Sequence, residues 1–291
     1  MRDSLDIAVL AIDGGGSRCR LACAGAGRES RVETGPANVY SDFDGAVARI
    51  RDGLSKLAAE AGVEVAALVR VPAFVGLAGV CSDATTAKLH HALPFERMLI
   101  EDDRPAALRG ALGHADGAVI HCGTGSFLAF QKDGETRLAG GWGAVLGDEA
   151  SARWIGWMAL NHALRVTDGT LPANVWARAL VDDMGGVDAV LQFASSATPA
   201  DFGTIAPRVT EAATEGDPLA LSILERGADH VARAVQALGW SEGMALCLTG
   251  GVAPFYRDHL PQALADALQE PEGAPLDGAL SLAREMVHDD R

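Results

Sequence analysis

The sequence of 291 residues lacks any run of about 18 consecutive apolar residues, the length that an ordinary transmembrane helix needs. Its first six residues include two acids and no long apolar segment, so we expect no secretory signal. Hydrophobic residues nevertheless make up 48% and charged residues 22%, so a sizeable core can form and disorder is not expected. The length suits one large domain or two smaller ones.

Positive charge is also scarce. Lys and Arg number 24 against 39 Asp and Glu, which gives a formal net charge of −15, and no basic run occurs. A chain this acidic is a poor candidate for binding nucleic acid or an anionic membrane surface. If it binds phosphate groups, it must do so locally, through backbone N–H groups and a metal ion, against an unfavourable overall field.

Cysteines are few, odd in number and scattered along the chain. No histidine joins the first two at metal-ligand spacing, so a structural zinc site is not expected. The pattern fits a reduced cytoplasmic protein better than a disulfide scaffold. The cysteines are Cys19, Cys23, Cys81, Cys122 and Cys247.

The most informative segment follows a short apolar run, residues 7–12, which predicts a buried strand. Residues 18–25 and 28–33 predict two further strands. The segment between the first strand and the second therefore forms a hairpin turn. Its glycines let the backbone approach a ligand and aim N–H groups at phosphate oxygens, and its Asp can hold Mg²⁺. An ordinary turn is the alternative, and neither a P-loop nor a Rossmann fingerprint is present. The turn reads Asp13-Gly14-Gly15-Gly16-Ser17-Arg18.

A second strand–turn–strand unit begins at an apolar run over residues 118–122 and returns over residues 127–131. The repeat is structural rather than a duplication of sequence, and it suggests two related domains. A hairpin turn is again the alternative, but the two turns together favour a shared phosphate site more than either alone. This turn reads Gly123-Thr124-Gly125-Ser126.

A carboxylate cluster follows a short strand predicted over residues 97–100. Asp103 can accept a proton from a substrate hydroxyl, or it can cap the helix predicted over residues 104–112. A second carboxylate beside it, Asp102, is expected to raise its pKa.

Two more glycine segments could contact a ligand. The first, Gly140-Gly141-Trp142-Gly143, leads to Leu146-Gly147-Asp148-Glu149, whose carboxylates can accept hydrogen bonds from sugar hydroxyls; a loop and a helix start are the alternative. The second, Thr249-Gly250-Gly251, could lie flat against adenine or ribose; a tight turn after a strand is the alternative.

The remaining periodicity alternates between strands and helices, which indicates the α/β class. Strands are predicted over residues 68–77 and 245–249. Helices are predicted over residues 42–61, 150–166, 174–182, 187–193, 218–238 and 277–286.

These motifs, in this order, resemble the sugar-kinase branch of the actin/hexokinase/Hsp70 ATPase superfamily. More closely, they are similar to the BadF/BadG/BcrA/BcrD-type ATPases, which include N-acetylglucosamine kinase and glucosamine kinase. The resemblance covers almost the whole chain and includes residues 275–280, which look like the start of that family's C-terminal helix. It rests on residues 13–17, 123–126, 140–143, 147–149 and 249–251.

The resemblance implies an α/β fold of two actin-like (ribonuclease H-like) domains with a central ATP/sugar cleft. The expected divisions are residues 1–113, residues 114–275, and a C-terminal helix over 276–291 that packs back on the first domain. It also implies an ATP-dependent kinase acting on the 6-hydroxyl of glucosamine or N-acetylglucosamine, with Mg²⁺, in the cytoplasm and as a possible homodimer.

Individual roles follow from the resemblance as well. Asp103 would be the general base, and Asp13 would hold the metal ion. Arg18 stands where lysine is usual, and Asp102 stands where Asn or Thr is common, so both are departures. Sugar contacts would come from Asn38, Gly79, Asp103, Gly141 and Asp148. Nucleotide contacts would come from Gly14, Gly15, Gly16, Ser17, Arg18, Thr124, Gly125, Ser126, Gly250 and Gly251.

The alternative function is an ATP-hydrolysing activator of an iron–sulfur reductase or dehydratase, as other members of the same broad family are. Such proteins hold a cluster through cysteines at a dimer interface, and no compact cysteine motif occurs here. A sugar-responsive repressor is disfavoured because no helix-turn-helix precedes the first strand and the chain is acidic.

Overall fold

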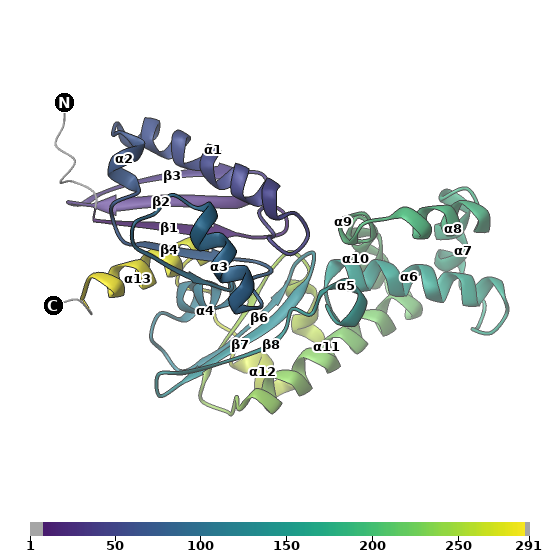
Figure 1. Cartoon of the computed structure of the whole chain (residues 1–291). Helices are drawn as coiled ribbons and strands as arrows, with labels where there is room; N and C mark the ends of the chain where they lie inside the picture. The colour runs from purple at the N-terminus through teal and green to yellow at the C-terminus, as the bar shows by residue number, and fades with distance from the viewer. Residues whose placement is uncertain (1–7, 289–291) are drawn as a thin grey trace. The chain divides into compact units, whose positions relative to one another are not determined.

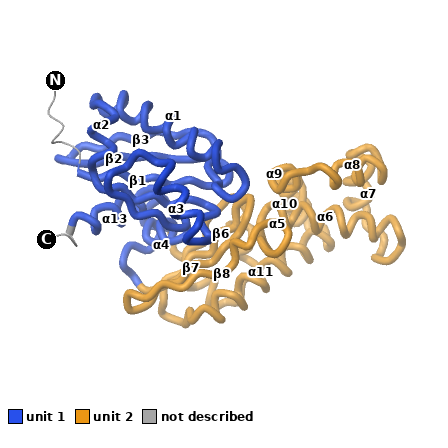
Figure 2. The backbone as a smooth tube through the Cα atoms, viewed as in Figure 1, with its two compact units in different colours: residues 1–115, 271–291 blue, residues 116–270 orange. Residues whose placement is uncertain are grey.

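The computed structural model of the protein describes residues 8–288. The segment that we expect to hold no secretory signal, and Ile7 of the first predicted strand, lie outside the described residues. The described chain divides into two compact units (Figure 2). Unit 1 contains the residues up to Ala115 and those from Pro271 onward, and unit 2 contains Asp116–Glu270.

Unit 1 is built on a five-stranded mixed sheet with the order β3-β2-β1-β4-β5. Figure 1 labels the first four of these strands. The first three strands form an antiparallel meander, whereas β1, β4 and β5 run parallel. The strands are β1 (Val9–Gly14), β2 (Cys19–Gly25), β3 (Arg28–Thr34), β4 (Ala73–Leu77) and β5 (Met98–Glu101).

Alternation along β1 sends its side chains into two different cores. Leu10 and Ile12 pack in the core that includes the buried face of α1 (Phe43–Ala61). Val9 and Ala11 pack instead in the core that includes α13 (Pro275–His288) and the first turn of α4 (Arg104–Leu112). Asp13 has the parity of Val9 and Ala11, so it lies on the α4 and α13 face, at the carboxyl end of β1.

Two glycines allow α13 and α4 to cross closely. A Cβ atom on Gly278 would lie 2.0 Å from the carbonyl oxygen of Ala106, and one on Gly110 would lie 2.3 Å from that of Ala274. Real Cβ atoms do not approach backbone oxygens so closely, so both positions require glycine. Helix α13 thereby fixes the helix that begins directly after Asp103.

Unit 2 repeats the sheet topology of unit 1. Its strand order is β8-β7-β6-β9, with β6, β7 and β8 antiparallel and β6 parallel to β9. This matches β3-β2-β1-β4, so the structural repeat expected from the two turns is confirmed as a shared topology. The strands are β6 (Gly117–Cys122), β7 (Ser126–Lys132), β8 (Glu135–Gly140) and β9 (Ala245–Thr249).

Helices make up the rest of both units. The predicted helix over residues 218–238 is confirmed as α11 (Pro218–Leu238), where Asp217 caps the N-terminus and Gly239 ends the helix in the left-handed region. Unit 1 also contains α2 (Val65–Leu68) and α3 (Asp83–Ala92). Unit 2 also contains α5 (Gly143–Leu146), α6 (Ala152–Thr167), α7 (Val175–Asp183), α8 (Val187–Ser196), α9 (Pro199–Gly203), α10 (Ala206–Thr214), the 3-10 helix η2 (Ala253–His259) and α12 (Gln262–Asp266).

The strand predicted over residues 68–77 is wrong in its first half. Leu68 ends α2, and β4 begins only at Ala73. Pro72 lies between them and has no N–H to donate to a sheet ladder, which agrees with the later start. Within residues 8–288, no helix is both long enough and apolar enough to cross a membrane.

Candidate active site

The turn between β1 and β2 leaves several backbone donors free. The N–H of Gly15 donates to the carbonyl of Arg18 at 2.9 Å, which closes the turn. Among the described residues, no acceptor takes the N–H groups of Gly16, Ser17 or Arg18. Gly16 and Ser17 are also exposed. Successive free N–H groups in an exposed turn can bind the oxygens of a phosphate group.

Gly14 has a packing role beneath this turn. A Cβ atom there would lie 2.5 Å from Cδ2 of Leu77 and 3.2 Å from Cβ of Ala37. Its carbonyl accepts a hydrogen bond of 2.7 Å from the N–H of Ala78. Gly14 therefore lets β1 and β4 approach each other directly below the turn.

Asp13 is a buried carboxylate, 8% exposed, with a cationic neighbour. Arg20 stands opposite it in the β1–β2 register, with Nη1 3.6 Å from Oδ2. Burial raises the pKa of Asp13, while the charges of Arg20 and Arg18 oppose that rise. Arg20 was not singled out from the sequence, although a charged residue within an otherwise apolar strand indicates a buried partner.

The cations near Asp13 share a second acid. Oε2 of Glu33, on β3, lies 3.8 Å from Nε of Arg20 and 3.6 Å from Nη1 of Arg18. Arg18 therefore has a protein partner here, and a phosphate group that it binds must compete with Glu33. Both side chains are more than half exposed, so this ion pair is weak. A bound phosphate group can therefore replace Glu33 as the partner of Arg18 at little cost in free energy.

Asp103 occupies the N-cap position of α4, but its side chain makes no capping hydrogen bond. The neighbouring Asp102 takes that role, since its Oδ1 accepts from the N–H of Arg104 at 3.0 Å. The alternative prediction, in which the Asp103 carboxyl caps the helix, is therefore wrong. Burial, and then the charges of Asp102 and Asp13, raise the pKa of Asp103 to about 7. Such a carboxyl can take up or release a proton near neutral pH.

Asn38 and Gly79, far apart in sequence, lie together in unit 1. The Oδ1 atom of Asn38 accepts from the N–H groups of Tyr40 at 3.0 Å and Ser41 at 3.2 Å. Gly79 has a φ of +90°, and a Cβ atom on it would lie 2.7 Å from that same oxygen. The turn exposes 82% of Tyr40, an aromatic surface that was missed in the sequence and that suits the apolar face of a sugar ring.

The turn between β6 and β7 in unit 2 is built like the first one. The N–H of Gly123 donates to the carbonyl of Gly125 at 2.9 Å, and Thr124 is exposed. No acceptor among the described residues takes the N–H groups of Thr124 or Gly125. The carbonyl of Gly123 accepts from the N–H of Ala152 at 2.8 Å, which ties the turn to the first residue of α6.

Ser126 and Asp148 hold this second turn in place. The Ser126 hydroxyl donates to the carbonyl of Glu149 at 2.6 Å, so it is already engaged within the protein. Asp148 is 8% exposed, and its Oδ1 accepts from the N–H of Ser126 at 3.4 Å. Burial raises the pKa of Asp148, while the Ser126 N–H and the charge of Arg153 lower it. Gly141 is beside them, because its N–H donates to the carbonyl of Ser126.

The third glycine turn packs directly against the second. Gly250 has a φ of +91°, and a Cβ atom on it would lie 2.3 Å from the carbonyl oxygen of Cys122. Gly251 has no atom within 4 Å of the equivalent position, so one side of it is open. His121 bridges the two turns, with Nδ1 3.0 Å from the hydroxyl of Thr249, and burial lowers its pKa to about 4.

The donor set in unit 1 fits magnesium rather than a metal held by protein alone. Among the described residues, no group of three or more His, Cys, Asp or Glu side chains could hold an ion. Mg²⁺ characteristically keeps several waters and binds one or two carboxylates together with phosphate oxygens. A single buried carboxylate, Asp13, below a turn with free N–H groups meets that requirement.

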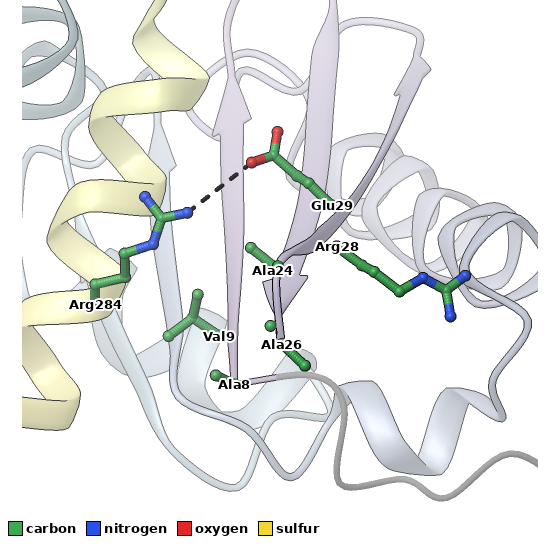
Figure 3. Close-up of a pocket in the computed structure, with 9 residues that line it drawn as sticks. Ala8, Val9, Ala24, Ala26, Arg28, Glu29 and Arg284 are labelled. Atoms are coloured by element: carbon green, nitrogen blue, oxygen red, sulfur yellow. Dashed lines mark ion pairs between the residues drawn. The ribbon is translucent and has the colours of Figure 1, made fainter.

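A separate hollow of about 410 Å³ lies in unit 1 (Figure 3). Val9 and Ala24 line it, and Arg284 on α13 reaches toward Glu29, with 3.9 Å between Nη2 and Oε2. Because Val9 begins β1 and Asp13 is near its end, the hollow is not part of the candidate site.

A model of the BadF/BadG/BcrA/BcrD ATPase family matches residues 10–275, which is most of the chain. The chain belongs to this family. It is 26% identical over 281 residues to glucosamine kinase GspK of Vibrio cholerae, covering 95% of this chain and 96% of that protein.

Two solved structures place the fold. A structure from Chromobacterium violaceum, described as a candidate N-acetylglucosamine kinase, is 29% identical, has a TM-score of 0.84, and covers 97% of this chain and 100% of that chain. A ROK-family glucokinase from Streptomyces griseus, solved with glucose and AMPPNP, is 19% identical with a TM-score of 0.57, covering 96% and 99%. The chain therefore has the α/β fold of two actin-like units.

Proposed function

We propose that this protein is an ATP-dependent kinase that phosphorylates the 6-hydroxyl of an amino sugar, glucosamine or N-acetylglucosamine. The observation that carries the proposal is the Asp103 carboxyl, which lies at a helix start without capping it and has a pKa of about 7. The glucosamine kinase and the candidate N-acetylglucosamine kinase to which the chain is similar support the class of acceptor.

In the proposed reaction, Asp103 accepts the proton of the sugar hydroxyl as the hydroxyl oxygen forms a bond to the γ-phosphorus of ATP. The bond from that phosphorus to the β–γ bridging oxygen breaks, and ADP leaves. Phosphoryl transfer depends mainly on positioning and on charge stabilisation, so the base needs to orient the hydroxyl as well as remove its proton. A pKa near 7 leaves much of Asp103 ionised under physiological conditions.

The two hairpin turns are the proposed phosphate-binding elements. Gly15, Gly16, Ser17 and Arg18 would serve one part of the phosphate chain, and Thr124, Gly125 and Ser126 would serve another. The free N–H groups of Gly16, Ser17, Arg18, Thr124 and Gly125 support this, because fixed backbone donors stabilise the charge that develops on phosphate oxygens. The N–H groups of Gly15 and Ser126 and the Ser126 hydroxyl already bond within the protein, so these two residues would shape the turns rather than donate. Gly14 would contribute by packing below the first turn, and Gly250 and Gly251 would contact the adenosine.

Mg²⁺ would bind near Asp13 and neutralise charge on the phosphate oxygens. The guanidinium of Arg20 places a positive charge beside Oδ2 of Asp13 and limits the rotation of this carboxylate. The remaining coordination positions suit water and phosphate oxygens.

The sugar contacts are proposed to come from Asn38, Gly79, Gly141 and Asp148. In unit 1, the Asn38 amide nitrogen remains available for a sugar hydroxyl, because only its oxygen bonds the Tyr40 and Ser41 N–H groups. In unit 2, Asp148 offers carboxylate oxygens as acceptors, although burial leaves little of the residue exposed.

Three further expectations stay predictions. They are the domain division at residues 113 and 275, the homodimer and the cytoplasmic location.

The cysteines argue against the iron–sulfur activator as the alternative. Cys19, Cys23, Cys122 and Cys247 are buried, and only Cys81 is exposed. A cluster at a dimer interface needs thiolates that reach the surface, and burial raises the pKa of both Cys19 and Cys122 to about 12.

A coupled ADP-release assay with Mg-ATP tests the proposal, with glucosamine, N-acetylglucosamine, glucose and no sugar as parallel samples. The expected result is turnover that depends strongly on one of the two amino sugars. ADP release at the same rate without sugar, or in the presence of glucose alone, would contradict the proposed acceptor.

A further inference from the structure

The segment that joins α5 to α6 in unit 2 has a strained backbone. Asp148 has a φ of +61° and Ala150 has a φ of +65°, the left-handed region that non-glycine residues seldom adopt. Both residues are buried. Strained residues persist only where surrounding contacts hold them, so this segment must be held by contacts of its own.

Within this segment, each residue from Asp148 to Ala150 accepts a hydrogen bond from another element. Ser126 supplies two of them, from its N–H to Asp148 at 3.4 Å and from its hydroxyl to Glu149 at 2.6 Å. The third comes from Tyr256, whose hydroxyl donates to the carbonyl oxygen of Ala150 at 2.7 Å. This last bond joins the segment to η2.

Tyr256 is placed for this bond by its own packing. The residue is fully buried, and a Cβ atom on Gly227 of α11 would lie 2.6 Å from its ring, so that glycine leaves the space the ring fills. A buried hydroxyl without water must find a protein acceptor, and the Ala150 carbonyl is the acceptor it has. η2 itself follows the Gly250-Gly251 turn, which is tied to β6 through the Val252 N–H and the Cys122 carbonyl.

We propose that Tyr256 is a positioning residue: its hydroxyl holds the left-handed Asp148–Ala150 segment and thereby places the Asp148 carboxylate beside the Gly123–Ser126 turn. The inference rests on the proposed function for its kinetic consequence, since Asp148 is a proposed sugar contact. It links the proposed adenosine turn to the proposed sugar contact through one buried hydrogen bond.

Replacing Tyr256 with phenylalanine tests the contribution of the hydroxyl separately from that of the ring. Tyr256→Phe keeps the ring in the space beside Gly227 but leaves the Ala150 carbonyl without its donor. We expect KM for the amino sugar to rise roughly tenfold, the change that one lost hydrogen bond of typical strength produces. We expect kcat to change much less, because the proposed base, Asp103, belongs to unit 1 rather than to this segment.

Ala150→Gly provides the decisive background. Glycine adopts a positive φ without steric strain, so a segment with glycine in place of Ala150 needs less holding. The Tyr256→Phe effect on KM should therefore shrink to about twofold when measured against Ala150→Gly alone. Ser222→Ala is the matched control, because it removes a hydroxyl that bonds within α11, at 2.7 Å to Leu219, and has no link to the segment.

Amide hydrogen exchange of the peptide spanning residues 147–152, measured by mass spectrometry, supplies a readout that needs no sugar. Faster exchange and raised KM in Tyr256→Phe, both diminished by Ala150→Gly, are the expected result. Unchanged exchange and KM in Tyr256→Phe would overturn the inference. So would increases in exchange and KM that are equally large with Ala150 and with glycine at that position. If the wild-type protein turns over no amino sugar, the proposed function fails, and the exchange measurement still decides whether Tyr256 holds the segment.

Discussion

At the scale of single residues, the surroundings of the Asp103 carboxyl set it apart from its neighbour Asp102. Asp102 forms the hydrogen bond to the Arg104 N–H that starts α4, which leaves the Asp103 side chain unused by the helix. Burial and two neighbouring acids make its proton harder to remove than that of an ordinary aspartate. Of the two adjacent aspartates, only Asp102 caps the helix, so the Asp103 carboxyl remains available for the proposed role as base.

Replacing the proposed base gives the first prediction. Asp103→Asn keeps the shape of the side chain but cannot accept the sugar proton, so kcat should fall by at least about two orders of magnitude. Binding of ATP, measured by calorimetry, should persist, because the nucleotide contacts are elsewhere. Full activity in this variant would remove Asp103 from the mechanism.

The raised pKa gives a second prediction, about pH. A general base acts when ionised, so kcat/KM for the sugar should fall about tenfold per pH unit below pH 7 and level off above it. Asp102→Asn removes a negative charge that raises the pKa of Asp103, so the inflection should move to lower pH. A pH profile identical to that of the wild type would show that Asp102 has no such effect.

At the scale of elements, the glycine turns show what a sequence can and cannot predict. The spacing of Asp13–Ser17 and of Gly123–Ser126 correctly indicated turns between antiparallel strands. It could not show that Gly14 is needed for packing against Leu77, because that contact comes from a strand far along the chain. It also could not show that the Ser126 hydroxyl is used by Glu149.

Element ends were predictable where local chemistry defines them. α4 and α11 follow the predicted ranges because Pro105 and Pro218 suit a first helical turn and Gly113 and Gly239 end the helices. The meeting of Asn38 with Gly79 was implied only by resemblance, since it results from the segment after β3, whose Val39 N–H donates to the carbonyl of Ala78 at 3.0 Å, rather than from spacing.

Gly250 and Gly251 provide the prediction at this scale. Gly250→Ala forces a Cβ atom against the Cys122 carbonyl at a positive φ, so it should displace the turns, lower Tm, and raise KM for ATP at least about tenfold. Gly251→Ala is the control for folding, because nothing lies within 4 Å of its Cβ position, and its Tm should match the wild type. Equal Tm values in both variants would contradict this description of the turn.

At the scale of the whole molecule, the two units share the order of four strands and hold different candidate groups. Unit 1 holds the carboxylates Asp13 and Asp103, whereas unit 2 holds Asp148 and the two glycine turns at the ends of β6 and β9. With a net charge of −15, phosphate binding must rely on fixed backbone donors rather than on the overall field. The two turns predicted two related domains, whereas the matching strand orders required the structure.

The distribution of cysteines gives a prediction for the intact protein. Titration with a thiol reagent should find one fast-reacting thiol in the native state and five after denaturation, because only Cys81 is exposed. Cys81→Ser should abolish the fast reaction. Several fast-reacting thiols in the native protein would instead favour a cysteine-ligated cluster and the activator function.

In the proposed reaction, the γ-phosphoryl group of ATP is transferred to the 6-hydroxyl of an amino sugar. Phosphorus NMR of the products, after incubation with Mg-ATP and glucosamine or N-acetylglucosamine, tests this most directly. The expected products are ADP and a sugar monophosphate whose phosphorus couples to the two protons on carbon 6. Inorganic phosphate as the sole phosphorus product besides ADP would contradict it and show an ATPase rather than a kinase.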